Sequence, residues 1–312
     1  MANTEGVVGA IGRTQRRHTA PAVAWATLKK FQQDRATRLA AMIAFWAFFS
    51  VFPIFLLLVS ILGYVLPAST KSEVLHHVAA LFPMLDPSSV GRISGSVWTI
   101  VVGGVSALWS GLAVMRATEF AFNSVWKIPM DQRPKQVEQI RRALSALGTI
   151  GVGLVVSTAI SGFVTGKDIG VNLGLVGHIV GYAVAAALDI GLFLVAFRML
   201  TDRAVGLRDM LPGALLSGVV FWILQQLSSF IISRHLQSAQ STYGHFATVI
   251  TILWWFYLQA VVTMLGAELN VVLHERLYPR SLGSQPDAEA DRRDTGAGFG
   301  GATAQEGNRR RA

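Results

Sequence analysis

Residues 39–66 read LAAMIAFWAFFSVFPIFLLLVSILGYVL, without a single charged side chain. At about 1.5 Å of rise per residue, roughly 20 apolar residues span the ~30 Å hydrocarbon core of a bilayer. This stretch is therefore long enough to cross a membrane as a helix. Similar stretches recur at about 97–126, 143–165, 174–200, 210–233 and 245–274. We expect an all-α, polytopic membrane protein with about six transmembrane helices.

The composition supports this fold class. The chain of 312 residues is 52% hydrophobic and only 14% charged, with a mean hydropathy of +0.47. Soluble domains carry about 25% charged residues. A soluble protein of this length has room to bury one or two long apolar helices, but not six.

The basic residues of the loops predict an orientation. Lys and Arg are concentrated before the first stretch, in the second and fourth loops and in the C-terminal tail. The other loops carry only Lys71, Arg92, Lys167 and Arg234. Because basic residues next to spans are retained in the cytoplasm, both termini are predicted to be cytoplasmic. The polar, basic N-terminus contains no cleavable signal peptide, so the first span would act as an uncleaved anchor.

The net charge of +9 and the pI near 10.3 follow from the same topology. A basic soluble domain would suggest nucleic-acid binding, but here the excess lies where orientation alone would place it. We therefore expect no nucleic-acid partner. Attraction to anionic lipid headgroups at the cytoplasmic face, about 1 kcal/mol per basic residue near the surface, is expected instead.

Outside the membrane domain at 21–278, residues 1–20 and 279–312 have too little apolar surface to fold and are expected to be disordered. Trp25, Leu28 and Phe31 recur at three-residue spacing, with Lys29 and Lys30 beside them. The pattern indicates either a short amphipathic helix on the cytoplasmic surface or an extension of the first span. Residues 72–82 predict a short amphipathic helix in the first outer loop.

Polar side chains inside the apolar stretches are few. An ionisable group at the centre of a transmembrane helix costs about 2.5–3.5 kcal/mol, so each is a functional candidate. The candidates for a polar cluster or substrate pathway in the cytoplasmic half are Arg116, Glu119, Asn123, Asp189, Glu268 and Asn270. A purely structural pair between Arg116 and Glu119, three residues apart on one helix, is the simpler alternative.

Glu268 has no basic neighbour in its own stretch. We therefore expect the second and sixth spans to pack together, with Arg116 bridging Glu119 and Glu268. In the first span, Pro53 removes a backbone hydrogen bond and is expected to kink the helix.

Signatures of enzymes are missing from the sequence. It contains no GxxxxGK[ST], HExxH or GxSxG motif, and it has no cysteine for disulfides or zinc–thiolate sites. The carboxylates are too sparse for the two metal ions of a nuclease. We therefore expect no enzymatic activity, no cofactor and no metal.

Three stretches together resemble one family. They are RLAAMIAFWAFFSVFP at 38–53, ALWS at 107–110 with Arg116 and AFNSVW at 121–126, and YGHFATVI at 243–250 followed by LGAELN at 265–270. They resemble the YihY / virulence factor BrkB family of bacterial inner-membrane proteins, formerly labelled ribonuclease BN. The likeness covers about residues 25–278. It implies six spans and an inner-membrane location, and Arg116, Asn123, Glu268 and Asn270 match family positions. His245 and Phe122 depart from its pattern.

The leading hypothesis is a transporter or exporter of a small or amphipathic solute, such as a lipid. Without an ATP-binding motif, transport would be passive or driven by an ion gradient. The alternatives are a non-transporting membrane scaffold or envelope-integrity factor and, last, a ribonuclease.

Overall fold

The computed structural model describes residues 19–65, 97–165 and 174–279, and these are built of helices without a strand. Six of the helices in the described part are long and apolar enough to cross a membrane. The prediction of an all-α, polytopic membrane protein is confirmed. The long helices are α2 Thr19–Gln33, α3 Ala36–Val65, α6 Val97–Val125, α7 Gln136–Thr165, α8 Gly174–Met199, α9 Leu207–Tyr243 and α10 Ala247–His274; the short 3-10 helices are η1 Met130–Gln132 and η3 Gly244–Phe246.

Each predicted apolar stretch overlaps one long helix. Helix α7 begins at Gln136, so the polar segment before the third stretch extends that helix, and α9 runs on to Tyr243, well past the predicted end at 233. Helix α2 begins at Thr19, inside the segment expected to be disordered. The remaining predictions for 1–18, 72–82 and 280–312 concern residues outside the described part of the chain.

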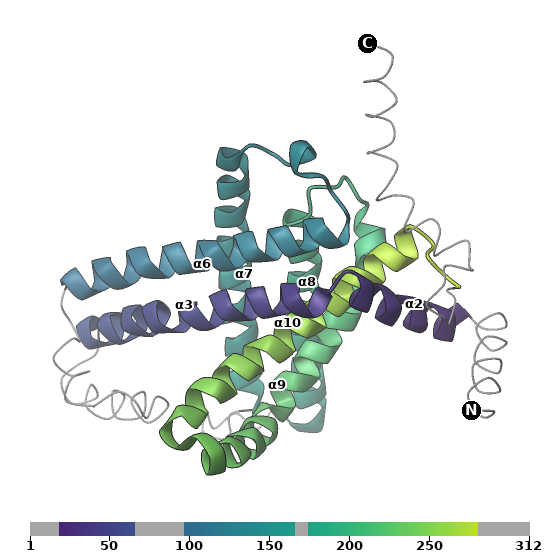
Figure 1. Cartoon of the computed structure of the whole chain (residues 1–312). Coiled ribbons are helices and arrows are strands. Elements are labelled where there is room, and N and C mark those ends of the chain that lie inside the picture. The colour runs from purple at the N-terminus through teal and green to yellow at the C-terminus, as the bar shows by residue number, and fades with distance from the viewer. Residues whose placement is uncertain (1–18, 66–96, 166–173, 280–312) are drawn as a thin grey trace.

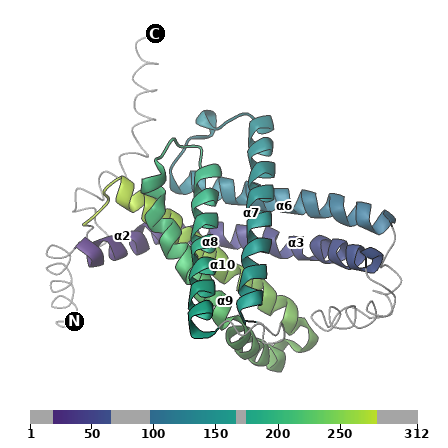
Figure 2. The same cartoon turned by 180° about the vertical axis from the view of Figure 1, so that it is seen from behind.

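The six spans pack in a closed order. Helix α3 contacts α6 and α10, and the contacts continue from α6 to α7, α8, α9 and back to α10. Figures 1 and 2 show the α3/α6 pair and the α7/α8 pair extending in clearly different directions, with α9 and α10 between them.

Aromatic side chains hold the α3/α6 pair together. Trp109 of α6 meets the edges of Trp46 and Phe49 of α3, with ring centroids 6.0 and 6.4 Å apart. Such edge-to-face pairs contribute about 0.5–1.5 kcal/mol each beyond their buried area. Helix α3 is continuous through Pro53, so the proline does not break it.

Helices α9 and α10 approach each other backbone to backbone. A Cβ atom on Gly266 would lie 2.0 Å from Ser217 Oγ, and one on Gly213 would lie 2.1 Å from the Gly266 carbonyl oxygen. The Ser217 hydroxyl donates to the carbonyl of Val262 across this contact, at 3.1 Å. Small residues at such positions are what allow membrane helices to pack closely.

Three helices end in a left-handed residue that is basic rather than glycine. Arg35 after α2, Lys127 after α6 and Arg276 after α10 have φ of 53°, 52° and 52°. At the end of α6, the Ile128 N–H donates to the Asn123 carbonyl, and at the end of α10 the Leu277 N–H donates to the Val272 carbonyl. Both bonds follow the Schellman pattern of a helix end. A positive charge at these ends also suits the helix dipole.

The turn at Arg35 makes α2 a helix of its own, packed against α10, rather than an extension of the first span. Its buried face consists of Ala22, Ala26, Thr27, Lys30 and Phe31, at three- and four-residue spacing. Trp25 and Leu28, predicted to share one apolar face with Phe31, are exposed in the protein alone. The helix is amphipathic, and the face that it buries within the protein carries Lys30 and Phe31. That α2 lies on the membrane surface stays a prediction.

Candidate functional site

Polar side chains from several helix ends meet in one cluster, which we call the polar hub. It consists of Asn123, Glu138, Arg142, Asp202, Arg203 and Glu275.

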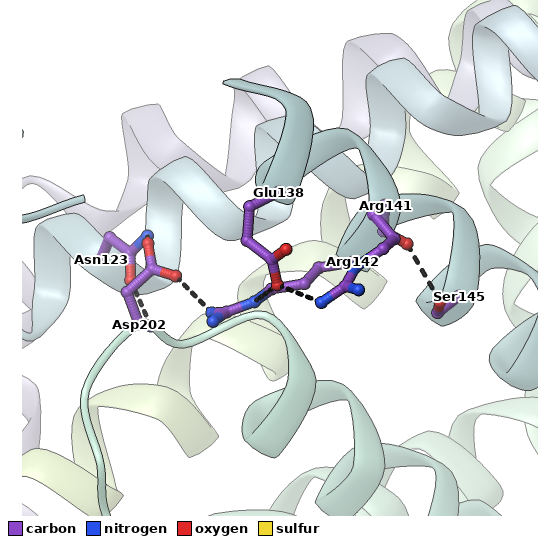
Figure 3. A network of polar contacts seen from close by, with 6 residues as sticks. All are labelled: Asn123, Glu138, Arg141, Arg142, Ser145 and Asp202. Carbon is purple, nitrogen blue, oxygen red and sulfur yellow. Dashed lines mark hydrogen bonds and ion pairs between the residues drawn. The ribbon is translucent and has the colours of Figure 1, made fainter. Parts of the chain in front are cut away.

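At its centre, Asn123 of α6 and Asp202 of the α8–α9 connection bind each other twice (Figure 3). The Asn123 amide donates to Asp202 Oδ2 at 2.6 Å, and the Asp202 backbone N–H donates to Asn123 Oδ1 at 2.9 Å. Asn123 is fully buried. This exchange satisfies two buried groups at once, which ties α6 to the end of α8.

Arg142 of α7 joins the same pair to its own helix (Figure 3). Its guanidinium donates to Asp202 Oδ1 at 2.9 Å and to Glu138 Oε1 at 3.1 Å. Arg141 donates to the same Glu138 oxygen from a side chain that is 75% exposed. The Arg142 contact with a carboxylate that is 3% exposed is therefore the stronger link, whereas the Arg141 pair is largely screened by solvent.

The other side of the hub involves α10. Arg203 donates to Glu275 Oε1 at 2.7 Å and lies over the ring of Trp126, 5.3 Å from its centroid. The Trp126 ring in turn meets the edge of His274, and His274 Nδ1 lies 3.3 Å from Asp209 Oδ2 at the start of α9. The hub thus connects the ends of α6, α7, α8, α9 and α10.

A pocket of about 410 Å³ opens beside the hub. We call it the α6/α7 pocket; its lining residues are Arg116, Glu119, Phe120, Asn123, Met130, Arg133, Pro134, Lys135, Gln136 and Gln139. Arg116, Glu119 and Asn123 are three and four residues apart, so α6 presents them on one face. Three of the six candidates predicted from sequence therefore meet at this pocket.

The charged residues of the pocket differ sharply in exposure. Arg116 is exposed, whereas Glu119 is 5% exposed. Within the described part of the chain, Glu119 Oε1 is buried without a hydrogen-bond partner. No ion pair forms there between Arg116 and Glu119, so the predicted structural pair is not made. Asp202, Arg142, Arg116 and Arg133 all act on Glu119 electrostatically.

Glu268 lies in a different environment, and here the expected bridge from Arg116 is wrong. Its partner is Lys30 of α2, with Nζ 3.0 Å from Glu268 Oε2 and both side chains fully buried. The ammonium also donates to Asp34 and, at 3.0 Å, to the Val125 carbonyl at the end of α6. Its three donors thus meet three acceptors. The reason is that α2 folds back on α10 and reaches Glu268, whereas Arg116 points into the exposed pocket.

The surroundings of Lys30 keep it charged. Burial by itself would lower the pKa of this ammonium, but the Coulomb attraction of Glu268 and Asp34, with the hydrogen bonds to both, outweighs burial and raises the pKa above its ordinary value of 10.5.

The two remaining candidates lie apart from the pocket. Asn270 Oδ1 accepts the backbone N–H of Gly213 at 2.7 Å and holds α9 on α10. Asp189, 2% exposed, accepts a hydrogen bond from Ser157 of α7 at 2.8 Å. It borders a separate pocket of about 140 Å³ with Ile150, Leu192, Phe193, Ala196 and Phe221. The six candidates thus lie at four places rather than in one cluster.

Sequence reasoning missed Lys30 and Asp202. Lys30 was counted with the basic residues that set topology, although Asp34 four residues later is a local signal for an ion pair. Asp202 follows the fourth span and carries no local pattern. Among the described residues, no three His, Cys, Asp or Glu side chains are placed to hold a metal ion.

Comparisons with known proteins agree on the family. The family model described as virulence factor BrkB matches residues 27–291. The ribonuclease-like protein YfkH of Bacillus subtilis is 28% identical over 71% of this chain and 84% of its own length. The UPF0761 membrane protein PSHAa0171 of Pseudoalteromonas translucida is 24% identical over 66% and 67%, and a UPF0761 membrane protein of Azotobacter vinelandii is 25% identical over 77% and 60%. No solved structure matches significantly. The chain belongs to the virulence factor BrkB family of membrane proteins.

Proposed function

We propose that this protein transports a small or amphipathic solute across the bacterial inner membrane, with both termini in the cytoplasm. The observation that carries the proposal is the α6/α7 pocket, where Arg116 and the buried Glu119 lie in one wall. A buried carboxylate oxygen without a partner is costly in a scaffold but useful where a solute or an ion completes it. The loop charges support placing this end of the bundle on the cytoplasmic side.

A non-transporting scaffold or envelope-integrity factor is the second candidate. It is favoured by Glu268 and Asn270, because both match family positions and both hold helices together, through Lys30 and Gly213. Folding alone would account for these two residues. Glu119 instead lines the α6/α7 pocket, and its Oε1 has no hydrogen-bond partner within the described residues.

The two candidates are separated by a deletion strain scored for accumulated metabolites and membrane lipids. The strain is complemented with the wild type, with Arg116→Gln, and with Arg141→Gln as the control. Like Arg116, Arg141 is an exposed arginine, but it lies on α7 and its side chain donates to Glu138 outside the pocket. If the protein is a transporter, a solute should accumulate in the deletion strain. Complementation with Arg116→Gln should then fail to clear this solute, although the variant is folded and abundant. If Arg116→Gln clears the solute fully, the scaffold is favoured.

Catalysis is not part of the proposal. The name of the Bacillus relative refers to ribonuclease-like character, so purified protein should be tested on RNA with divalent metals. We expect no cleavage. Metal-dependent cleavage that co-purifies through several columns and disappears with one carboxylate substitution would contradict this.

A further inference from the structure

The α6/α7 pocket has more positive charge than its own carboxylate neutralises. Arg116, Arg133 and Lys135 line it, and none of the three forms an ion pair within the described residues. In the adjoining hub, Arg142 and Arg203 each pair with a carboxylate. With Glu119 ionised, the three basic side chains leave the lining at +3 − 1 = +2. The hub has three carboxylates for its two arginines, whereas the pocket lining keeps an excess of positive charge.

Contacts within the protein fix the orientation of one of these basic groups, Arg133. The Arg133 guanidinium donates to the Ile128 carbonyl at 3.2 and 3.4 Å and lies over the Phe120 ring, 5.2 Å from its centroid. These contacts fix its plane but leave its charge unneutralised. A planar guanidinium held in this way loses little freedom when it binds an oxyanion with two hydrogen bonds.

We propose that the α6/α7 pocket binds an anionic phosphate ester through Arg116, Arg133 and Lys135, and that Glu119 takes up a proton as the ester binds. The volume of about 410 Å³ fits a phosphate together with its substituent. Phe120, Met130 and Pro134 offer apolar surface to that substituent. Binding of the ester does not depend on the proposed function; that the ester is the transported solute rests on the proposed function.

The proton follows from the position of Glu119. The carboxylate shares the wall with the three basic residues, and Asp202 already acts on it as a second negative charge from the α8–α9 connection. The attractions come from Arg142 of α7, Arg116 of α6 and Arg133 of the α6–α7 connection. A phosphate bound to Arg116 and Arg133 competes with Glu119 for these two cations and places a second negative charge beside the carboxylate. The affinity for the phosphate is therefore higher when Glu119 is neutral. By linkage, affinity rises as pH falls.

A lipid headgroup and a free ester share this chemistry, and two probes distinguish them. Diphenyl phosphate is a soluble diester, and phosphatidylglycerol in dodecyl maltoside micelles is a lipid diester; both keep a constant charge over the pH range used. Calorimetric titration of the purified full-length protein measures each, with phosphatidylcholine as the zwitterionic control. Stronger binding of phosphatidylglycerol identifies a lipid headgroup, and binding of diphenyl phosphate alone identifies a soluble ester.

The variants decide whether binding occurs at the pocket. We expect Arg133→Gln and Lys135→Gln to weaken binding by about tenfold each, the loss typical of one charge-assisted hydrogen bond. Arg141→Gln, outside the pocket, should leave it unchanged. Lys135 is exposed, so its variant folds even if that of Arg133 does not. The proposed site would be overturned if Arg133→Gln, Lys135→Gln and Arg141→Gln lost equal affinity. It would also be overturned if the wild type bound neither diester.

The proton has its own readout. Wild-type affinity should increase as pH falls, and Glu119→Gln should remove that dependence while keeping tight binding. A pH dependence that persists in Glu119→Gln refutes the proton uptake. If the purified protein binds the diester but the deletion strain shows no transport defect, the proposed function is contradicted while the proposed binding site still stands.

Discussion

Lys30 and Glu268 lie 238 positions apart in the chain, yet their side chains form an ion pair of 3.0 Å from which solvent is excluded. The pair joins the helix before the first span to the last span, and the Val125 carbonyl brings the end of α6 into the same contact. Taking two charges out of water is costly, so such a pair persists only when its hydrogen bonds are complete. Lys30 meets that condition with three acceptors.

The first prediction is that removing one member of this pair is worse than removing both. Lys30→Met takes the ammonium away from the buried Glu268, and losing one partner of a buried pair typically costs about 3–5 kcal/mol. Glu268→Leu leaves Lys30 bound to Asp34 and to the Val125 carbonyl, so its loss should be smaller. The double variant should lose less than the sum, and the thermal midpoint in detergent measures the coupling. Arg38→Met, an exposed basic residue nearby, serves as the control. Additive losses in the double variant would mean that the pair is not coupled.

The second prediction concerns pH. Because the folded-state pKa of Lys30 is raised above 10.5, the stability that its charge contributes is fully present below about pH 10.5 and is lost as pH rises through the folded value. The difference in thermal midpoint between wild type and Lys30→Met should therefore stay constant between about pH 7 and pH 9. A difference that shrinks within this range would show that Lys30 loses its proton in the folded protein.

These contacts show where sequence reasoning reached its limit. The apolar stretches identified the spans because hydrophobic length is a local property. Helical periodicity likewise placed Arg116, Glu119 and Asn123 on one face of one helix. The partner of Glu268 is a tertiary property: it depends on the left-handed turn at Arg35, which directs α2 onto α10. A lysine before a span has the same local pattern whether it marks topology or enters the core.

The third prediction tests the centre of the polar hub. Asn123→Leu deprives Asp202 of an amide donor and its backbone N–H of an acceptor, and each buried group left without a partner costs about 1–3 kcal/mol. Asn123→Asp should be worse, because it places a second carboxylate beside the first. Adding Asp202→Asn to it should recover part of the loss, since one donor–acceptor pair returns but Arg142 loses its carboxylate.

Thermal midpoints of the purified variants measure these effects. Ser124→Ala is the matched control, because its hydroxyl donates to the carbonyl of Phe120 in its own helix and to no other group among the described residues. If Asn123→Leu and Ser124→Ala lose equally little stability, the exchange between Asn123 and Asp202 does not hold the hub together.

The fourth prediction concerns the crossing of α9 and α10. In Gly266→Ala the new methyl group would lie 2.0 Å from Ser217 Oγ and 2.7 Å from the Gly213 carbonyl oxygen, so the helices must separate. Overpacking of this kind costs about 1–3 kcal/mol. Gly148→Ala provides the contrast, because within the described residues no atom beyond the adjacent backbone of α7 itself lies within 4 Å of the new methyl group. Alanine also favours helix by about 1 kcal/mol over glycine. Equal effects of the two substitutions on the thermal midpoint would contradict the close crossing.

The fifth prediction concerns orientation, and the absence of cysteine from the chain makes it direct to test. Asp131→Cys lies in η1 beside the hub, and Phe246→Cys lies in η3 between α9 and α10. Both positions are exposed. Helix α10 begins after Phe246 and ends at His274 in the hub region, so the two cysteines lie at opposite ends of the spans.

The loop charges predict that the hub faces the cytoplasm, because basic residues beside spans are retained there. A membrane-impermeant maleimide should therefore label Phe246→Cys in intact spheroplasts and label Asp131→Cys only after the membrane is permeabilised. Labelling of both variants in detergent confirms that each thiol is accessible. The reverse pattern in intact spheroplasts would invert the topology and place the α6/α7 pocket outside, where it would receive its solute from the other side of the membrane.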